Sequence, residues 1–132
     1  MTPTLAFAAA FLVTLALLAV VAWSGVRAKR RVHVPAVGLT VASLCVTIFY
    51  AYRLGHALDL KSAGVITPIH LFLARLATLA IVVTIGIGLR ALFVPKTIGL
   101  HKRAAWISLS LVVLAAITGL VMVGLAKPIQ GS

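Results

Sequence analysis

Four long runs of apolar residues, separated by short basic or polar segments, occupy nearly all of the 132-residue chain. Hydrophobic residues make up 63% of the sequence, charged residues only 10%, and the mean hydropathy is +1.22. A helix needs about 20 mostly apolar residues to cross a hydrocarbon core of roughly 30 Å. The sequence therefore predicts an all-α integral membrane protein, a four-transmembrane-helix bundle with a single domain over residues 1–132. The predicted spans are residues 5–26, 34–52, 68–89 and 101–126.

The basic side chains predict how these spans are oriented. They lie at the ends of the apolar runs and form no contiguous basic surface of the kind that binds nucleic acid. We therefore expect the lipid bilayer as a partner, and no nucleic acid. Cytoplasmic loops carry the excess of Lys and Arg. Eight such residues fall on one side: Arg27, Lys29, Arg30, Arg31, Arg90, Lys96, Lys102 and Arg103. Three fall on the other: Arg53, Lys61 and Lys127. This asymmetry predicts a multi-pass membrane protein with the N and C termini both outside.

Local signals refine the expected helix ends and contacts. Pro35 is expected near the first turn of the second span, where its missing N–H costs little. Thr67 is expected to be the N-cap of the third span, with Pro68 in its first turn. Small residues four apart let helices approach closely where lipid provides no hydrophobic drive. The candidate pairs are Gly38 with Ala42 and Ala115 with Gly119.

Four histidines stand at the predicted ends of three spans. His33 and His101 open the second and fourth spans, so both are expected near the cytoplasmic interface. His56 closes the second span and His70 opens the third, which places both near the outer interface. The 23 residues from His33 to His56 correspond to roughly 34 Å of helix at about 1.5 Å per residue. One metal ion therefore cannot bind all four, and the pattern predicts two pairs.

Paired imidazoles from facing helices are what a six-coordinate haem b requires, and a closer approach would suit a metal ion such as copper. The alternative is that these are interfacial histidines without a ligand, which hydrogen-bond the backbone or reach the headgroups. Arg75 lies five residues beyond His70, inside the third span, where an unpaired cation is costly. Asp59, a lipid phosphate or a haem propionate would neutralise it. The candidate cofactor-binding set is thus His56, His70 and Arg75 on the outer side and His33 and His101 on the cytoplasmic side.

Asp59 is the only carboxylate side chain of the protein. Catalysis by paired carboxylates and proton relay through carboxylates are therefore excluded for this chain alone. The sequence also has no glycine-rich phosphate loop and no His-Glu-x-x-His motif. We expect no independent catalytic activity.

The contexts of the four histidines resemble a bacterial membrane family catalogued as domain of unknown function 420, which includes CtaM-like oxidase-assembly proteins. The similarity covers residues 30 to 125. It is carried by RRVH ending at His33, YRLGH ending at His56, ITPIHLFLA around His70 and LHKRAAW around His101, with the Thr118-Gly119 step further along. The resemblance implies a multi-pass protein of a bacterial inner (cytoplasmic) membrane, with its termini on the periplasmic side. It also implies a role in maturation of haem-copper respiratory oxidases, with the histidines as haem or copper ligands.

Three functions remain open from the sequence. The first is a non-enzymatic membrane protein that assists haem (haem b or haem a) or copper insertion during assembly of a haem-copper oxidase. The second is a haem-b or pigment-binding accessory subunit, with other membrane subunits of a respiratory or photosynthetic electron-transfer complex as partners. The third is a small structural subunit whose histidines bind nothing.

Overall fold

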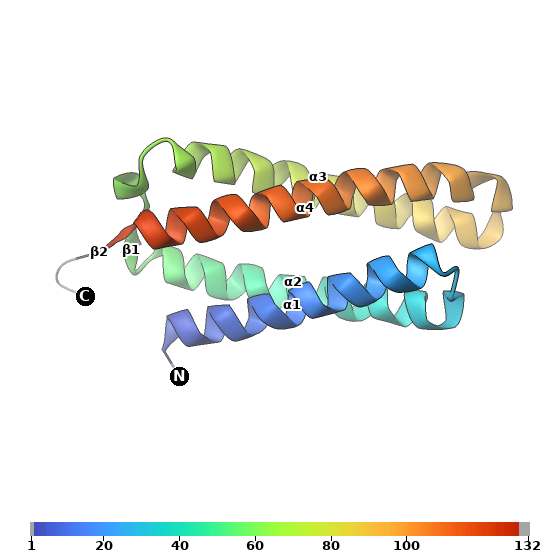
Figure 1. The fold of residues 1–132 in the computed structure, drawn as a ribbon, viewed down its shortest axis with the longest axis horizontal. Helices are drawn as coiled ribbons and strands as arrows, with labels where there is room; N and C mark the ends of the chain where they lie inside the picture. Colours follow the sequence, from blue (N-terminus) through green and yellow to red (C-terminus); the bar gives the residue numbers. More distant parts are fainter. Residues whose placement is uncertain (1, 130–132) are drawn as a thin grey trace. The chain divides into compact units, whose positions relative to one another are not determined.

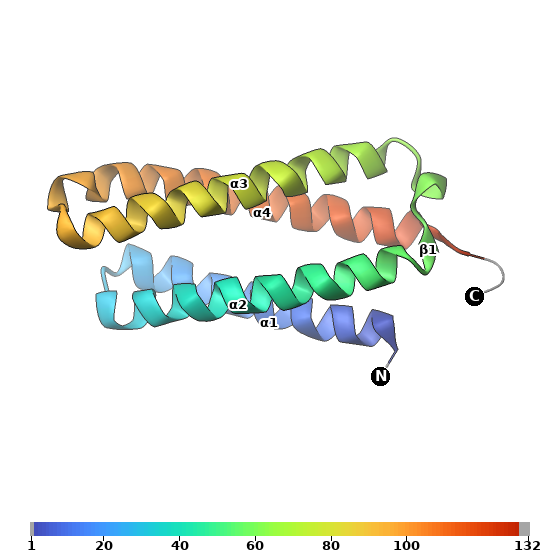
Figure 2. The ribbon, with the colours of Figure 1, turned by 180° about the vertical axis from the view of Figure 1, so that it is seen from behind.

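The structure is a computed structural model that describes residues 2–129, and it consists of helical hairpins (Figure 1). The chain divides into two compact units, residues 2–58 and 59–129 within the described part. The first unit contains α1 (Pro3–Val26) and α2 (Arg30–Gly55), and the second contains α3 (Ile66–Phe93) and α4 (Ile98–Leu125). Figures 1 and 2 show the two helices of each unit running antiparallel, side by side. The predicted single domain over residues 1–132 stays a prediction.

All four helices are long and apolar enough to cross a membrane. Their most apolar windows have mean hydropathies of 2.7, 1.9, 2.1 and 2.4, in chain order. Large apolar side chains such as Leu12, Phe72 and Leu79 are more than 60% exposed. Such exposure is expected where lipid is the solvent, because the surrounding hydrocarbon is as apolar as the side chains. The prediction of an all-helical protein with four membrane-length helices is confirmed.

The first hairpin begins with a capped helix and closes through a tight turn. Thr2 is the N-cap of α1, and its side chain accepts a hydrogen bond from the backbone N–H of Leu5. Pro3 follows as the first helical residue, a position where no N–H is needed. Between α1 and α2, Ala28 adopts a left-handed φ of 52°. This conformation reverses the chain within three residues, 27–29, and brings α2 back along α1.

Small and hydroxyl-bearing residues fill the interface between α1 and α2. Most buried residues of this hairpin are Ala, Ser or Thr, with Leu54 as the one large member. The Thr14 hydroxyl lies 2.7 Å from Oγ of Ser43 and 2.8 Å from Oγ1 of Thr47. Small residues allow the close approach of the helices, and the hydroxyl contacts join them where no water competes.

Replacing Thr14 with valine should weaken this hairpin by about 1 kcal/mol, because the change preserves shape but removes the hydroxyl that joins α1 to α2. The measurement is the free energy of unfolding of the purified protein in mixed detergent micelles. Thr78→Val is the matched control, since the exposed Thr78 hydroxyl bonds only to the carbonyl of Ala74 on its own helix. Equal stability of the two variants would contradict an interhelical role for Thr14.

The second hairpin is bounded by short elements. Strand β1 (Leu58–Asp59) and the 3-10 helix η1 (Leu60–Ala63) precede α3, while the 3-10 helix η2 (Pro95–Thr97) connects α3 to α4. Strand β2 (Lys127–Pro128) follows α4 and pairs with β1. Within the hairpin, the hydroxyls of Thr84 and Ser108 lie 2.7 Å apart and join α3 to α4.

Two local predictions are wrong, and a third is not met within its own hairpin. Pro35 is the sixth residue of α2, because the helix begins at Arg30, so Pro35 lies in the second turn and offers no N–H there. Thr67 lies inside the first turn of α3, where the N-cap is Val65, and the Thr67 hydroxyl donates to the carbonyl of Leu60 at 2.6 Å. Gly38 is exposed, and a Cβ placed on it would meet no atom within 4 Å. The pair that begins at Gly38 therefore makes no close contact with α1 in its own hairpin, and a contact with any other helix stays a prediction.

Candidate functional site

His33 lies in the first turns of α2, half-buried against the end of α1. Its Nδ1 is 3.1 Å from the carbonyl oxygen of Val21 and 3.2 Å from Oγ of Ser24. Ser24 is completely buried, and its hydroxyl donates to the same Val21 carbonyl. A Cβ placed on Gly25 would lie only 3.1 Å from Cε1 of His33. The imidazole thus packs on a glycine and hydrogen-bonds the preceding helix.

His70 lies near the start of α3, half-buried against α4. Its Nδ1 is 3.0 Å from the carbonyl oxygen of Ala115 and 3.3 Å from Oγ1 of Thr118. The Thr118 hydroxyl donates to the carbonyls of Leu114 and Ala115. A Cβ placed on Gly119 would lie 2.8 Å from Cε1 of the ring, closer than real Cβ contacts allow. Only glycine at this position leaves room for the imidazole.

His101, in the first turns of α4, packs on α3 in a related way. It is half-buried, and a Cβ placed on Gly88 would lie 2.9 Å from Cε1 of its ring. Three of the four histidines therefore rest on a glycine of the neighbouring helix in their own hairpin.

His56 differs from the other three. It is the exposed residue that directly follows α2, and its ring meets the ring of Tyr52 edge-on at 4.5 Å between centroids. Each predicted pair contains one histidine from the first unit and one from the second: His33 with His101, and His56 with His70. Both pairings stay predictions.

Arg75 is exposed on α3. Five residues of helix turn its side chain by about 140° relative to His70, which faces α4. Arg75 therefore points away from the helix against which His70 packs. Its predicted contact with an anionic cofactor group stays a prediction.

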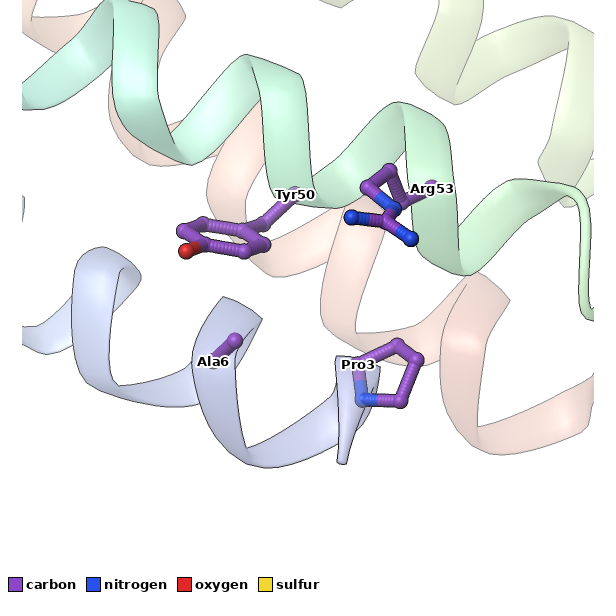
Figure 3. A pocket seen from close by; sticks show the side chains of 4 residues that line it. All are labelled: Pro3, Ala6, Tyr50 and Arg53. Atoms are coloured by element: carbon purple, nitrogen blue, oxygen red, sulfur yellow. The ribbon is translucent and has the colours of Figure 1, made fainter. Parts of the chain in front are cut away.

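A small pocket of about 80 Å³ opens at the other end of the first hairpin from His33 (Figure 3). Pro3 and Ala6 of α1 and Tyr50 and Arg53 of α2 line it. A guanidinium and a phenol hydroxyl thus stand near the end of two membrane-length helices. Side chains of this kind belong at the depth of lipid headgroups.

Among residues 2–129, no group of three or more His, Cys, Asp or Glu side chains is placed to hold a metal ion together. Sequence reasoning identified the histidines but missed Ser24, Gly25 and Gly88 as their neighbours. The Ser24-Gly25 and Thr118-Gly119 dipeptides were the available signal. On an apolar helix, the hydroxyl can hydrogen-bond the imidazole of a neighbouring helix, and the adjacent glycine leaves room for that ring.

The fold and these contacts define a multi-pass membrane protein whose helical hairpins hold half-buried imidazoles. Comparison of the chain with protein-family models, curated proteins and solved structures finds no match.

Proposed function

We propose that this protein is a non-enzymatic membrane protein that binds haem b through His70 and assists the assembly of a haem-copper respiratory oxidase. The oxidase role comes from the resemblance of the four histidine contexts to the CtaM-like family. The haem role is supported by one observation above all, the hydrogen bond between Nδ1 of His70 and the Ala115 carbonyl. Histidines that bind metals commonly donate their other ring N–H to a carbonyl or carboxylate, which orients the ring.

The surroundings of His70 fit a haem ligand. Gly119 removes the side chain that would fill the space at the ring, and Thr118 adds a second polar contact to Nδ1. Haem iron in b-type sites is held by imidazole, and the protein tunes it through hydrogen bonds to that ligand and through burial. Copper bound by imidazole alone is the other chemistry that this residue set supports.

The topology completes the proposal. The eight basic residues at the α1–α2 and α3–α4 connections support a topology with these turns in the cytoplasm of a bacterial cell and both termini outside. His70 then lies in the outer half of the membrane and His33 and His101 in the inner half. Other membrane subunits of the oxidase, or of a second electron-transfer complex, would be the partners.

Deletion of the gene is expected to lower haem-copper oxidase activity in membranes, because the oxidase would receive its cofactor less efficiently. The measurements are the reduced-minus-oxidised absorption spectrum of the membranes and their oxygen consumption. A plasmid copy of the wild-type gene should restore both, and a copy with His70→Ala should not. Unchanged spectra and oxygen consumption in the deletion strain would reject the assembly role.

The absorption spectrum and metal content of the purified protein separate the proposal from its alternatives. A low-spin haem spectrum supports haem binding, and copper without a haem band supports the copper form. Purification within a complex of electron-transfer subunits would favour an accessory subunit. A protein that takes up neither haem nor copper when these are supplied would be a structural subunit.

A further inference from the structure

His33 and His70 meet the same arrangement of atoms, although they lie in different hairpins. Each Nδ1 approaches a backbone carbonyl and the hydroxyl three residues further along the neighbouring helix, and each ring covers the glycine that follows. We call this arrangement the imidazole seat. It consists of Val21, Ser24 and Gly25 for His33 and of Ala115, Thr118 and Gly119 for His70.

We infer that the two imidazole seats are positioning sites that hold each ring with its proton on Nδ1, and that at His70 this leaves the lone pair on Nε2 to bind a metal or haem iron. The inference deepens the proposed function and rests on it for the identity of the ligand. It adds Ser24, Gly25, Thr118 and Gly119 as positioning residues.

The hydrogen bonds determine where the proton lies. A carbonyl oxygen only accepts, so the ring nitrogen that approaches Val21 or Ala115 must be the donor. The hydroxyl proton of Ser24 is already donated to the Val21 carbonyl, and that of Thr118 to carbonyls of its own helix. Each hydroxyl can therefore only accept from the ring. Both partners require the proton on Nδ1, and in a neutral imidazole this leaves Nε2 unprotonated.

The glycines determine where the ring lies. Gly25 and Gly119 stand four residues after the carbonyl, one helical turn along the same face. Their missing Cβ atoms leave room for Cε1, the ring atom between the two nitrogens. The hydrogen bonds set the orientation of the ring, and the glycine sets its distance from the helix axis. Metal-binding histidines need both to be fixed.

His101 provides an internal comparison. It also covers a glycine, Gly88, but the residue before that glycine is Ile87 rather than a serine or threonine. The glycine contact therefore occurs three times in residues 2–129, while a hydroxyl beside the glycine occurs only at His33 and His70.

The test uses the full-length protein in lipid nanodiscs with ¹⁵N-labelled histidine. Two-bond ¹⁵N–¹H correlation spectra distinguish a proton on Nδ1 from one on Nε2, and His→Gln variants assign the signals. We expect His33 and His70 to carry the proton on Nδ1. In Thr118→Val the Nε2-protonated form of His70 should appear, and binding of Co²⁺ by the purified protein should weaken about tenfold. Thr118→Ser should restore both properties.

Thr78→Val is the matched control, because this exposed hydroxyl lies on α3 and contacts only its own helix. It should leave the histidine spectra and the Co²⁺ affinity at their wild-type values. A proton on Nε2 of His70 in the wild-type protein, or a Thr118→Val spectrum identical to wild type, would overturn the inference. If instead the proton lies on Nδ1 but neither haem nor copper binds, the seat stands and the proposed haem function fails.

Discussion

Replacing His70 with alanine is expected to abolish any low-spin haem signal of the purified protein. His70 is the proposed axial ligand, and alanine offers no atom that can bind iron. The change should also remove the hydrogen bonds to Ala115 and Thr118 without leaving a charge in the helix interface. The measurements are the absorption spectrum and the haem and metal content after purification in mild detergent.

His70→Met keeps this experiment interpretable if alanine loosens the hairpin. Methionine binds haem iron through its thioether sulfur and raises the reduction potential relative to an imidazole. The methionine variant should therefore retain haem but show a shifted spectrum and a higher midpoint potential. Haem and metal content that stay at wild-type level in His70→Ala would show that His70 is not the ligand.

The second large effect is expected from Gly119→Ala. The added methyl group would lie 2.8 Å from Cε1 of His70, so the ring must move away from α4. Overpacking of this kind commonly costs about 1–3 kcal/mol of stability. Because the ring that moves is the proposed ligand, haem or Co²⁺ affinity should fall by about tenfold or more.

Gly124→Ala is the matched control for this change. Gly124 lies on the same helix, five residues further along, and a Cβ placed there would meet no atom within 4 Å. The control should bind cofactor and unfold like the wild-type protein. If Gly119→Ala and Gly124→Ala behave alike in a cofactor titration and in detergent unfolding, the glycine has no role in placing the imidazole.

Most of the helical architecture could be predicted from hydropathy, since lipid requires each crossing segment to be long, apolar and helical. The helix ends were less accurate, because backbone hydrogen bonding continues into polar residues at the interface. The second helix thus begins at Arg30, four residues before the predicted apolar span, and includes Pro35. How the helices are oriented in the membrane and which histidines pair across the hairpins stay predictions.

The candidate site was predicted in its residue types but not in its contacts. Histidines at the ends of apolar runs are visible in a sequence. Which side of the neighbouring helix meets them depends on helix rotation, and the weakly amphipathic spans contain little information about it. Ala115 was correctly placed at a close helix contact, where it is buried. Gly38 has the same small-residue spacing but is exposed, so the pattern alone could not distinguish the two positions.

The two imidazole seats enclose very different lengths of chain. The Val21 carbonyl and His33 are 12 residues apart, whereas His70 and the Ala115 carbonyl are 45 residues apart. Closing the longer loop costs more chain entropy, and during synthesis it also requires that α4 has left the ribosome. The first seat can close while the third helix is still being made. The proposed haem ligand His70 acquires its orientation only after the fourth helix has joined the third, so an incomplete chain would present the histidine without its seat.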